Sequence, residues 1–242
     1  MTERTDELFR ADSYLTTCEA HVLEVNERGG IILDRTVFYP TGGGQPGDRG
    51  VMTKEDGAEI RIGTTLYVGD DIVHVPEEGQ TLPQPGETVS CAIDWDNRFR
   101  LMQMHTTMHL MLALIPRPIN GCQVGADKSR IDFDLGDFDL DKERLEADLN
   151  ALTAADHSVT ITAVADEELD ARPELVRTMS VAPPRGKGTV RLIQIGRADA
   201  PVDLQPCGGT HVARTGEIGR LRIGKIENKG AHNKRIAVHL EG

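Results

Sequence analysis

The feature that most constrains the fold of this chain is a change of hydrophobic period near residue 94. Before that point, short apolar segments alternate with glycine, proline and acidic residues, which is typical of β-strands joined by turns. After it, the segment DWDNRFRLMQMHTTMHLMLALIP runs from Asp94 to Pro116 without a glycine, with Asp94 and Asp96 as candidate caps. Apolar residues nearly encircle its C-terminal half, so we predict a helix of about five turns, central to a second domain.

Six segments before residue 94 have the composition and pattern of strands. They read HVLEV, GIILD, EIRIG, LYVGD, DIVHV and TVSCAI. We therefore predict that residues 1–93 form a small β-barrel-like domain.

The remainder of the chain, residues 94–242, combines helix and strand patterns. A second helix is predicted for 141–155, where Leu145, Leu149 and Leu152 recur at helical spacing. The strand-like segments here read SRIDFDL, VTITAV, TVRLIQIG, GRLRIGKI and RIAVHL. The expected fold class is α+β, with helices packed on an antiparallel sheet in this second domain.

The stretch TGGGQPGDRG, which begins at Thr41, has the glycine spacing of a dinucleotide-binding loop, with Gly42, Gly44 and Gly47 at the required positions. Such a loop delivers a pyrophosphate to the N-terminus of a helix. Turn residues and strand patterning follow here instead, and no Gly-Lys-Ser/Thr is present, so we predict no nucleotide cofactor. The remaining interpretations are a plain turn between strands and a glycine loop that approaches a ligand with Thr41 and Gln45 as its polar side chains.

Two residue pairs have the spacing of metal ligands. His105 and His109 stand four residues apart on the predicted helix, so both imidazoles project from one face. Cys207 and His211 are also four apart, in the sequence CGGTH, whose glycines favour a turn over a helix. One thiolate and three imidazoles are typical ligands of tetrahedral zinc. We predict that these four residues hold a zinc ion.

The pattern differs from two common classes of zinc protein. A zinc protease would need a glutamate directly after His105, where this chain has Thr106. A zinc finger is a small domain that folds through its metal, whereas this domain has enough chain for a core of its own. We therefore expect the metal to serve chemistry, with one of its four ligands weakly held or displaceable.

The other histidines lack a partner at ligand spacing and are predicted to be surface or strand residues: His21, His74, His157, His232 and His239. Cys122 lies in NGCQVG after the long helix, and we expect a small buried thiol there rather than a further ligand.

The charge balance limits the partners. A formal net charge of -12 argues against nonspecific coating of nucleic acid, which needs an excess of lysine and arginine. Between residues 219 and 235, however, one acid, Glu227, stands against a set of cations: Arg220, Arg222, Lys225, Lys229, Lys234 and Arg235. This tail could contact phosphates, or it could be a solvated pair of strands.

The four cysteines are scattered, and the N-terminus is too polar for a signal peptide, which predicts a reducing, cytoplasmic location. No apolar run approaches the about 20 residues that a membrane helix needs.

Five segments together resemble one known family. They read FYPTGGGQPGDRG, HTTMH, NGCQVGADKSRIDFDL, QPCGGTHVARTGEIG and KIENKGAHNKRIAVHL, and they stand in the order found in the editing domain of alanyl-tRNA synthetase and in its free-standing relatives, the AlaX-type alanyl-tRNA editing proteins. The resemblance extends over nearly the whole chain. The chain lacks room for an aminoacylation domain, so we expect a free-standing protein similar to the larger AlaX type, which carries the glycine-loop domain.

The resemblance implies hydrolysis, in trans, of the ester that joins a wrong amino acid to alanine tRNA, chiefly serine, with glycine as a second candidate. A pocket for alanine rejects serine only about a hundredfold, so a second site that engages the serine hydroxyl must do the sorting. Thr41 and Gln45 are the candidate groups. Gln45 and backbone amides of the loop are candidates for the catalytic role of steadying the attacking water or the developing oxyanion, and Gly43 and Gly44 are candidates for binding the substrate.

In this hypothesis, zinc positions the ester or activates a water. Asp203 and Gln205 are candidates for orienting the ligands and for binding substrate. The candidate tRNA contacts are Arg222, Lys229, Lys234 and Arg235. Two other function classes stay open at this stage, a tRNA-binding module with purely structural zinc and a zinc hydrolase of small amino-acid esters or amides.

Overall fold

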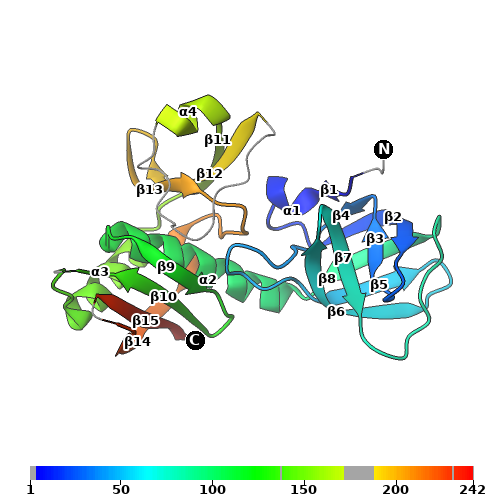
Figure 1. Cartoon of the computed structure of the whole chain (residues 1–242), viewed down its shortest axis with the longest axis horizontal. Helices are drawn as coiled ribbons and strands as arrows, with labels where there is room; N and C mark the ends of the chain where they lie inside the picture. Colours follow the sequence, from blue (N-terminus) through cyan, green and yellow to red (C-terminus); the bar gives the residue numbers. More distant parts are fainter. Residues whose placement is uncertain (1–3, 137, 172–187, 231, 242) are drawn as a thin grey trace. The chain divides into compact units, whose positions relative to one another are not determined.

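The computed structural model describes residues 4–136, 138–171, 188–230 and 232–241 (Figure 1). The chain divides into two compact units, Met1–Phe99 and Arg100–Gly242. The division falls within the long helix α2 (Trp95–Leu114), a few residues after the boundary expected from the sequence. The first turn of this helix therefore belongs to the first unit, and its remainder to the second.

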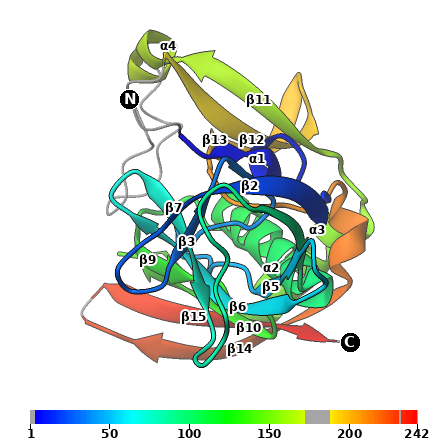
Figure 2. The same ribbon diagram turned by 90° about the vertical axis from the view of Figure 1, so that its right-hand side faces the viewer.

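The first unit is a closed barrel of six strands in the order β2-β3-β7-β6-β5-β8, which confirms the predicted barrel-like domain. The barrel strands, which face the viewer in Figure 2, are β2 (Thr17–Val25), β3 (Ile31–Leu33), β5 (Gly50–Lys54), β6 (Glu59–Val68), β7 (Asp71–Pro76) and β8 (Thr88–Ile93). Beside them, β1 (Asp6–Glu7) pairs in parallel with β4 (Arg35–Thr36), and α1 (Leu8–Ala11) is a single short turn.

Alternation along the strands fills the interior of the barrel. In β6, Ile60 and Ile62 are buried while Glu59 and Arg61 face solvent, as expected for a strand with one buried face. Ile60 and Ile62 join a core that includes Phe38 from the segment before the glycine loop. The chain continues from the glycine loop into strands β5 and β6 and not into the helix that a dinucleotide site requires.

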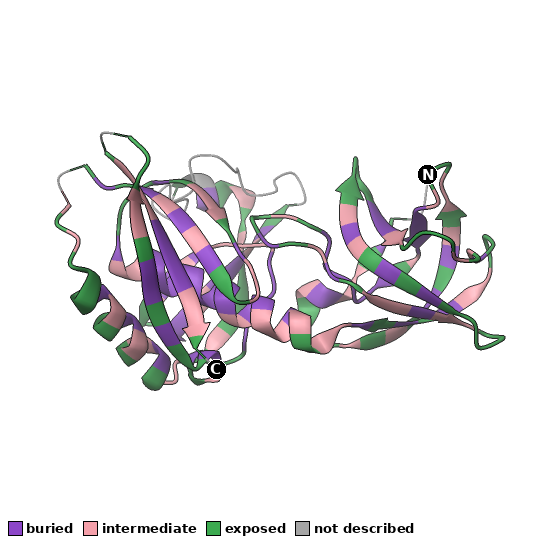
Figure 3. Ribbon diagram, turned by 90° about the horizontal axis from the view of Figure 1, so that it is seen from below, coloured by how far each residue is buried: buried purple, intermediate pink, exposed green. Residues whose placement is uncertain are grey.

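The second unit is α+β, as predicted, with two antiparallel sheets in the orders β14-β15-β10-β9 and β11-β12-β13. Its elements after α2 are β9 (Ile119–Gln123), β10 (Lys128–Asp134), α3 (Lys142–Ala154), β11 (Val159–Ala165), α4 (Asp166–Ala171), β12 (Thr189–Arg197), β13 (Ala200–Pro206), a 3-10 turn (Thr215–Ile218), β14 (Arg220–Asn228) and β15 (Asn233–Glu241). Helix α3 packs on β14. Figure 3 shows exposed positions along the outer side of α3 and buried positions inside the unit.

The two predicted helices begin at their expected caps. Asp94 accepts the backbone N–H of Asn97 at 3.2 Å, and Asp141 accepts that of Arg144 at 3.0 Å. Within the described residues, no helix is long and apolar enough to cross a membrane.

Candidate functional site

The structure brings together the four residues that the sequence singled out as metal ligands. His105 and His109 come from α2, and Cys207 and His211 follow the end of β13. One potential ligand atom from each side chain lies within 4.8 Å of all the others. The Cys207 sulfur is 3.3 Å from Nε2 of His211 and 3.5 Å from Nε2 of His105.

These distances test whether the donor set fits a zinc ion. A tetrahedral ion with Zn–S of about 2.3 Å and Zn–N of about 2.0–2.1 Å separates sulfur from nitrogen by about 3.6 Å. The two measured separations between Cys207 and its histidine neighbours are close to that value. The residues present therefore fit a four-coordinate metal.

Local structure explains how each ligand pair is placed. Residues four apart on a helix lie one turn apart on the same face, and the rings of His105 and His109 have centroids 5.6 Å apart. The turn that carries Cys207 is held from β12, where Arg191 donates to the carbonyl oxygens of Cys207 (2.6 Å) and Gly209 (3.1 Å). The Gly209 amide in turn donates to the Cys207 sulfur at 3.4 Å.

A second layer of polar groups orients the imidazoles. Nδ1 of His109 donates to a carboxylate oxygen of Asp203 at 2.8 Å, and the Gln205 amide donates to the same oxygen at 2.8 Å. With its proton on Nδ1, His109 presents Nε2 as the ligand atom. Both Asp203 and Gln205 are buried on β13. Their contacts accord with the predicted orienting role, and substrate binding by either remains a prediction.

Thr106 does the same for His211, a role that sequence reasoning missed. The Thr106 hydroxyl donates to the Met102 carbonyl at 2.9 Å and lies 3.2 Å from Nδ1 of His211. Since the hydroxyl proton is already donated, the hydroxyl oxygen accepts the Nδ1 proton, and Nε2 of His211 is left for a metal. Thr106 directly follows His105 on the helix, and this position beside a predicted ligand was the sign in the sequence that could have indicated its role.

The charges of the cluster suit metal binding. Burial raises the pKa of Cys207, but the neighbouring His105 and His211 outweigh it and lower that pKa well below its usual range. Burial lowers the pKa of His211 well below its ordinary value. Burial also lowers the pKa of His109, but hydrogen bonds to Asp203 and Cys207 dominate and raise it to about 10. A metal that binds Nε2 of His109 must therefore displace a proton.

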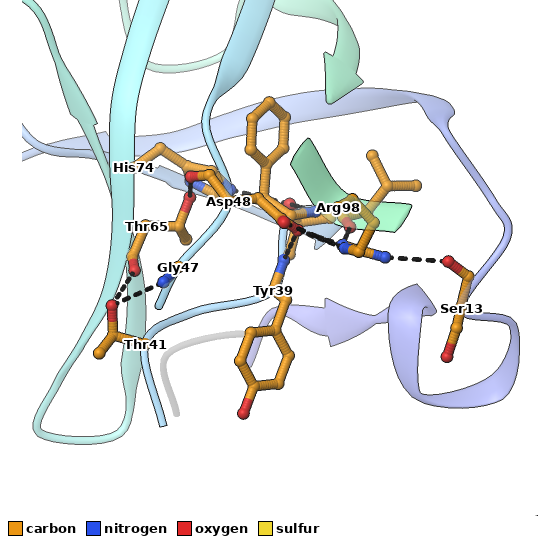
Figure 4. Close-up of polar contacts among 11 residues, drawn as sticks. Ser13, Tyr39, Thr41, Gly47, Asp48, Thr65, His74 and Arg98 are labelled. Carbon is orange, nitrogen blue, oxygen red and sulfur yellow. Dashed lines mark hydrogen bonds and ion pairs between the residues drawn. The ribbon is translucent and has the colours of Figure 1, made fainter. Parts of the chain in front are cut away.

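The glycine loop lies in the first unit and is held by Thr41 (Figure 4). The Thr41 hydroxyl accepts the Gly47 N–H at 2.8 Å and donates to the Thr65 carbonyl at 3.3 Å. At Gly47, a Cβ atom would lie 2.0 Å from that same carbonyl oxygen, so only glycine fits. Because its proton is donated to Thr65 on β6, the Thr41 hydroxyl can offer a ligand an accepting lone pair but no proton.

The tip of the loop is a tight turn. Gly42 and Gln45 exchange backbone hydrogen bonds of 3.0 and 2.9 Å. Gly43 (φ +56°) and Gly44 (φ +83°) between them are exposed and adopt the left-handed conformation that glycine favours. The side chain of Gln45 is fully buried.

A buried ion pair behind the loop was also missed by sequence reasoning. Asp48, directly after the glycines, accepts the Tyr39 N–H at 2.6 Å and pairs through both carboxylate oxygens with the Arg98 guanidinium. Arg98 also donates to the carbonyl oxygens of Ser13 (3.0 Å) and Val37 (2.7 Å). Figure 4 shows Arg98 between Asp48 and Ser13, and both charged side chains of the pair are essentially inaccessible to solvent. This pair ties the end of the glycine loop to the first turn of α2.

The predicted tRNA contacts lie on β14, β15 and the connection between them, where acids compensate several of the cations. Arg235 makes two hydrogen bonds of 2.7 and 2.6 Å to Asp132. Lys229 lies 3.0 Å from Glu227, and Arg222 lies 3.2 Å from Glu241. A pocket of about 170 Å³ on this sheet is lined by Lys128, Arg130, Lys225, Glu227, Arg235 and Ala237. Lys234 is half-buried on β15.

The remaining histidines stay outside the ligand cluster of the described residues. His74 is a fully buried strand residue, whereas His21 and His232 are exposed. His157 and His239 are half-buried. Cys122 is half-buried on β9, and burial together with the nearby Cys207 raises its pKa. Its thiol is therefore a poorer metal ligand than that of Cys207.

Comparison with known proteins gives the context of the two units. The family described as tRNA synthetases class II (A) matches residues 12–97, and the family described as threonyl and alanyl tRNA synthetase second additional domain matches residues 190–237. The alanyl-tRNA editing protein AlaX-M of Methanosarcina mazei is 38% identical, over 98% of this chain and 96% of that protein.

Two longer proteins show the same similarity over part of their length. The alanyl-tRNA editing protein AlaX-L of Pyrococcus horikoshii is 33% identical over 96% of this chain and 57% of that protein. The alanine–tRNA ligase of Pyrobaculum neutrophilum is 40% identical over 93% of this chain and 25% of the ligase. The similarity thus spans both units of the chain.

Proposed function

This chain belongs to the AlaX-type alanyl-tRNA editing proteins, and on that premise we propose that it hydrolyses the ester bond of mischarged alanine tRNA. The observation that carries the proposal is the convergence of one thiolate and three imidazoles on a common centre. Peptide hydrolysis of the usual zinc-protease type is disfavoured, because Thr106 stands where that class needs a glutamate base and is already engaged with His211.

We propose zinc as the metal, held by His105, His109, Cys207 and His211. When bound, zinc supplies a Lewis acid that polarises the ester carbonyl and stabilises the charge that develops on its oxygen. The chain supplies the positioning. Asp203 and Thr106 fix the two imidazoles whose Nδ1 protons they accept, which keeps both Nε2 atoms directed at the centre.

Serine is the proposed amino acid to be removed; glycine, which has no hydroxyl, is proposed as a second substrate on the family resemblance and not on a contact with Thr41. The Thr41 hydroxyl has an accepting lone pair left, which suits the donated proton of a serine hydroxyl. Alanine has no such hydroxyl and would leave the accepting group unpaired, which can lower its rate by about 10⁴-fold. Gly43 and Gly44 are proposed to bring backbone amides to the substrate, and Gln45 is proposed to support the loop from its buried position.

The tRNA is proposed to bind through the cations of β14, β15 and their connection. The candidate contacts are Arg222, Lys229, Lys234 and Arg235. Three of these residues form salt bridges with acidic side chains, which a phosphate would have to displace. Binding through such compensated cations should be local and weakened by salt.

The test is the release of serine from seryl-tRNA of the alanine acceptor, measured beside correctly charged alanyl-tRNA. We expect fast serine release, slow alanine release and no release by the His105→Ala variant. His21→Ala is the matched control, because His21 is an exposed histidine of the barrel. Full activity of His105→Ala with its metal lost would refute the metal mechanism.

A tRNA-binding module with structural zinc is the second candidate, because four protein ligands are the usual number of a closed, structural site. It would retain tRNA without turnover, and removing its metal would unfold the second unit. A zinc hydrolase of small amino-acid esters would release serine from a free ester as fast as from tRNA.

A further inference from the structure

Two of the cysteines face each other in the barrel. Cys18 on β2 and Cys91 on β8 are direct partners in the antiparallel register of these strands. Directly opposite residues in such a pair have Cα atoms about 4.5 to 5.5 Å apart and side chains on the same face. A disulfide needs Cα atoms about 4.4 to 6.8 Å apart. The Cα spacing expected for this pair therefore lies within the range that a disulfide spans.

The two thiols differ in access. Cys91 is fully buried in the barrel core, and Cys18 packs against the same core but is partly exposed. The hydrogen bond with Cys91 lowers the pKa of Cys18 more than burial raises it, and Val37 and Arg35 lower it further. The same hydrogen bond, together with burial, raises the pKa of Cys91. An accessible thiol of lowered pKa beside a second thiol is the usual arrangement of a redox-reactive cysteine pair.

We propose that Cys18 and Cys91 form a reversible dithiol site that hydrogen peroxide converts to a disulfide, with Cys18 as the thiol that reacts first and Cys91 as the thiol that resolves it. The site is independent of the editing chemistry, since neither cysteine belongs to the metal-ligand cluster. The sequence separation of these cysteines gave no sign of a pair, and only the closure of the barrel brings β2 and β8 together.

The reaction balances in two steps. The Cys18 thiolate attacks one oxygen of hydrogen peroxide, the O–O bond breaks, and hydroxide leaves while Cys18 becomes a sulfenic acid. The Cys91 sulfur then attacks the Cys18 sulfur, the S–O bond breaks, and the hydroxyl leaves as water with the thiol proton of Cys91. In total two thiols lose two electrons to one peroxide, which yields one disulfide and two waters. A dithiol reductant reverses the change by thiol–disulfide exchange.

The remaining cysteines provide internal controls. Cys122 and Cys207 lie in the second unit, and Cys207 is one of the proposed zinc ligands. The pKa of Cys122 is raised, mainly by burial, so this thiol should react slowly with peroxide. Selective loss of the barrel thiols is therefore the expected signature.

The experiment treats the full chain, supplied with zinc, with a small excess of hydrogen peroxide and then blocks the remaining thiols with iodoacetamide. We expect the mass to fall by about 2 Da before alkylation and a peptide that links Cys18 to Cys91, with dithiothreitol restoring both thiols. The crosslink closes a loop of roughly 70 residues, so the oxidised barrel should melt on the order of 10 °C higher. Cys122→Ala is the matched control and should form the same link.

The Cys91→Ala variant separates the two steps. Without its resolving partner, Cys18 should stop at the sulfenic acid, which dimedone traps. If Cys91→Ala does not fold, the peptide map of the unchanged chain still decides. Oxidation of Cys122 or Cys207 ahead of Cys18, or modification of Cys18 without a link to Cys91, would overturn the proposal.

Discussion

Replacing Arg98 by methionine should destabilise the first unit more than any other single change to the surroundings of the glycine loop. The Arg98 side chain is 0% exposed and the Asp48 side chain is 1% exposed, so water cannot solvate either charge if its partner is removed. Breaking such a pair from one side costs about 3 to 5 kcal/mol. Two backbone carbonyls, of Ser13 and Val37, lose their charged donor as well. We therefore expect a loss near 5 kcal/mol, a large share of the about 5 to 15 kcal/mol that holds a domain.

The double variant Asp48→Asn with Arg98→Met tests whether this cost comes from the uncompensated charge. Asparagine keeps an oxygen for the Tyr39 N–H but carries no charge, so no ion is left buried. The double variant should be more stable than Arg98→Met alone, by about 2 kcal/mol or more. Additive effects of the two substitutions would show that the pair is not coupled.

Urea unfolding followed by tryptophan fluorescence measures these changes. The chain has a single tryptophan, Trp95, which packs on the barrel core with its ring centroid 5.6 Å from that of Tyr14 and 5.5 Å from that of Phe99. The signal therefore reports on the first unit. A urea midpoint for Arg98→Met that implies a loss of less than about 1 kcal/mol in the free energy of unfolding would refute the reasoning. Such a result would mean that leaving the Asp48 carboxylate buried without its partner has almost no cost.

Three further predictions follow from single contacts. Burial lowers the pKa of His74 to about 4, below its unfolded value, so the barrel should lose about 3 kcal/mol as the pH falls from 6.5 to 4, measured by urea unfolding at each pH; a flat profile would contradict this. Gly47→Ala should destabilise the barrel by several kcal/mol, on the order of 3, whereas Gly121→Ala, where nothing lies within 4 Å of the added Cβ, should leave thermal unfolding nearly unchanged. Asp203→Asn should weaken zinc binding about 10- to 100-fold in chelator competition, and Asp199→Asn, an exposed surface change, should not.

Features that depend on local pattern were predictable from the sequence. Helix α2 begins directly after Asp94 because a capping carboxylate precedes a long segment without glycine, and α3 begins directly after Asp141 for the same reason. The alternation of β6 defines its buried face. The spacing of four residues found the four side chains that could hold a metal ion, because that spacing places side chains together on a helix and in a tight turn alike.

Features that depend on pairing across the fold were missed. Strand β13 contains Pro201 and Pro206, and β9 contains Asn120 followed by Gly121, so neither segment has a strand pattern of its own. The pairing of Asp48 with Arg98 joins residues from a loop and a helix, and no local period indicates it. Such elements form because tertiary neighbours supply the hydrogen bonds that their sequence does not specify.

The buried polar clusters around Asp48 and around Cys207 differ in what they need to be satisfied. Around Asp48 the chain provides everything itself, since one guanidinium and one amide proton meet the carboxylate. Around Cys207 it does not, because imidazole nitrogens and a sulfur face one another while the outer protons of His109 and His211 are directed away, at Asp203 and Thr106. The thiolate then needs a cation, which is an imidazolium at His109 when no metal is bound, consistent with the pKa of about 10, and a metal ion otherwise. A proton and a metal ion compete for Nε2 of His109, so the metal affinity of the cluster should rise with pH. The cluster can therefore exchange one cation for another, whereas the ion pair in the barrel contains both of its charges within the chain.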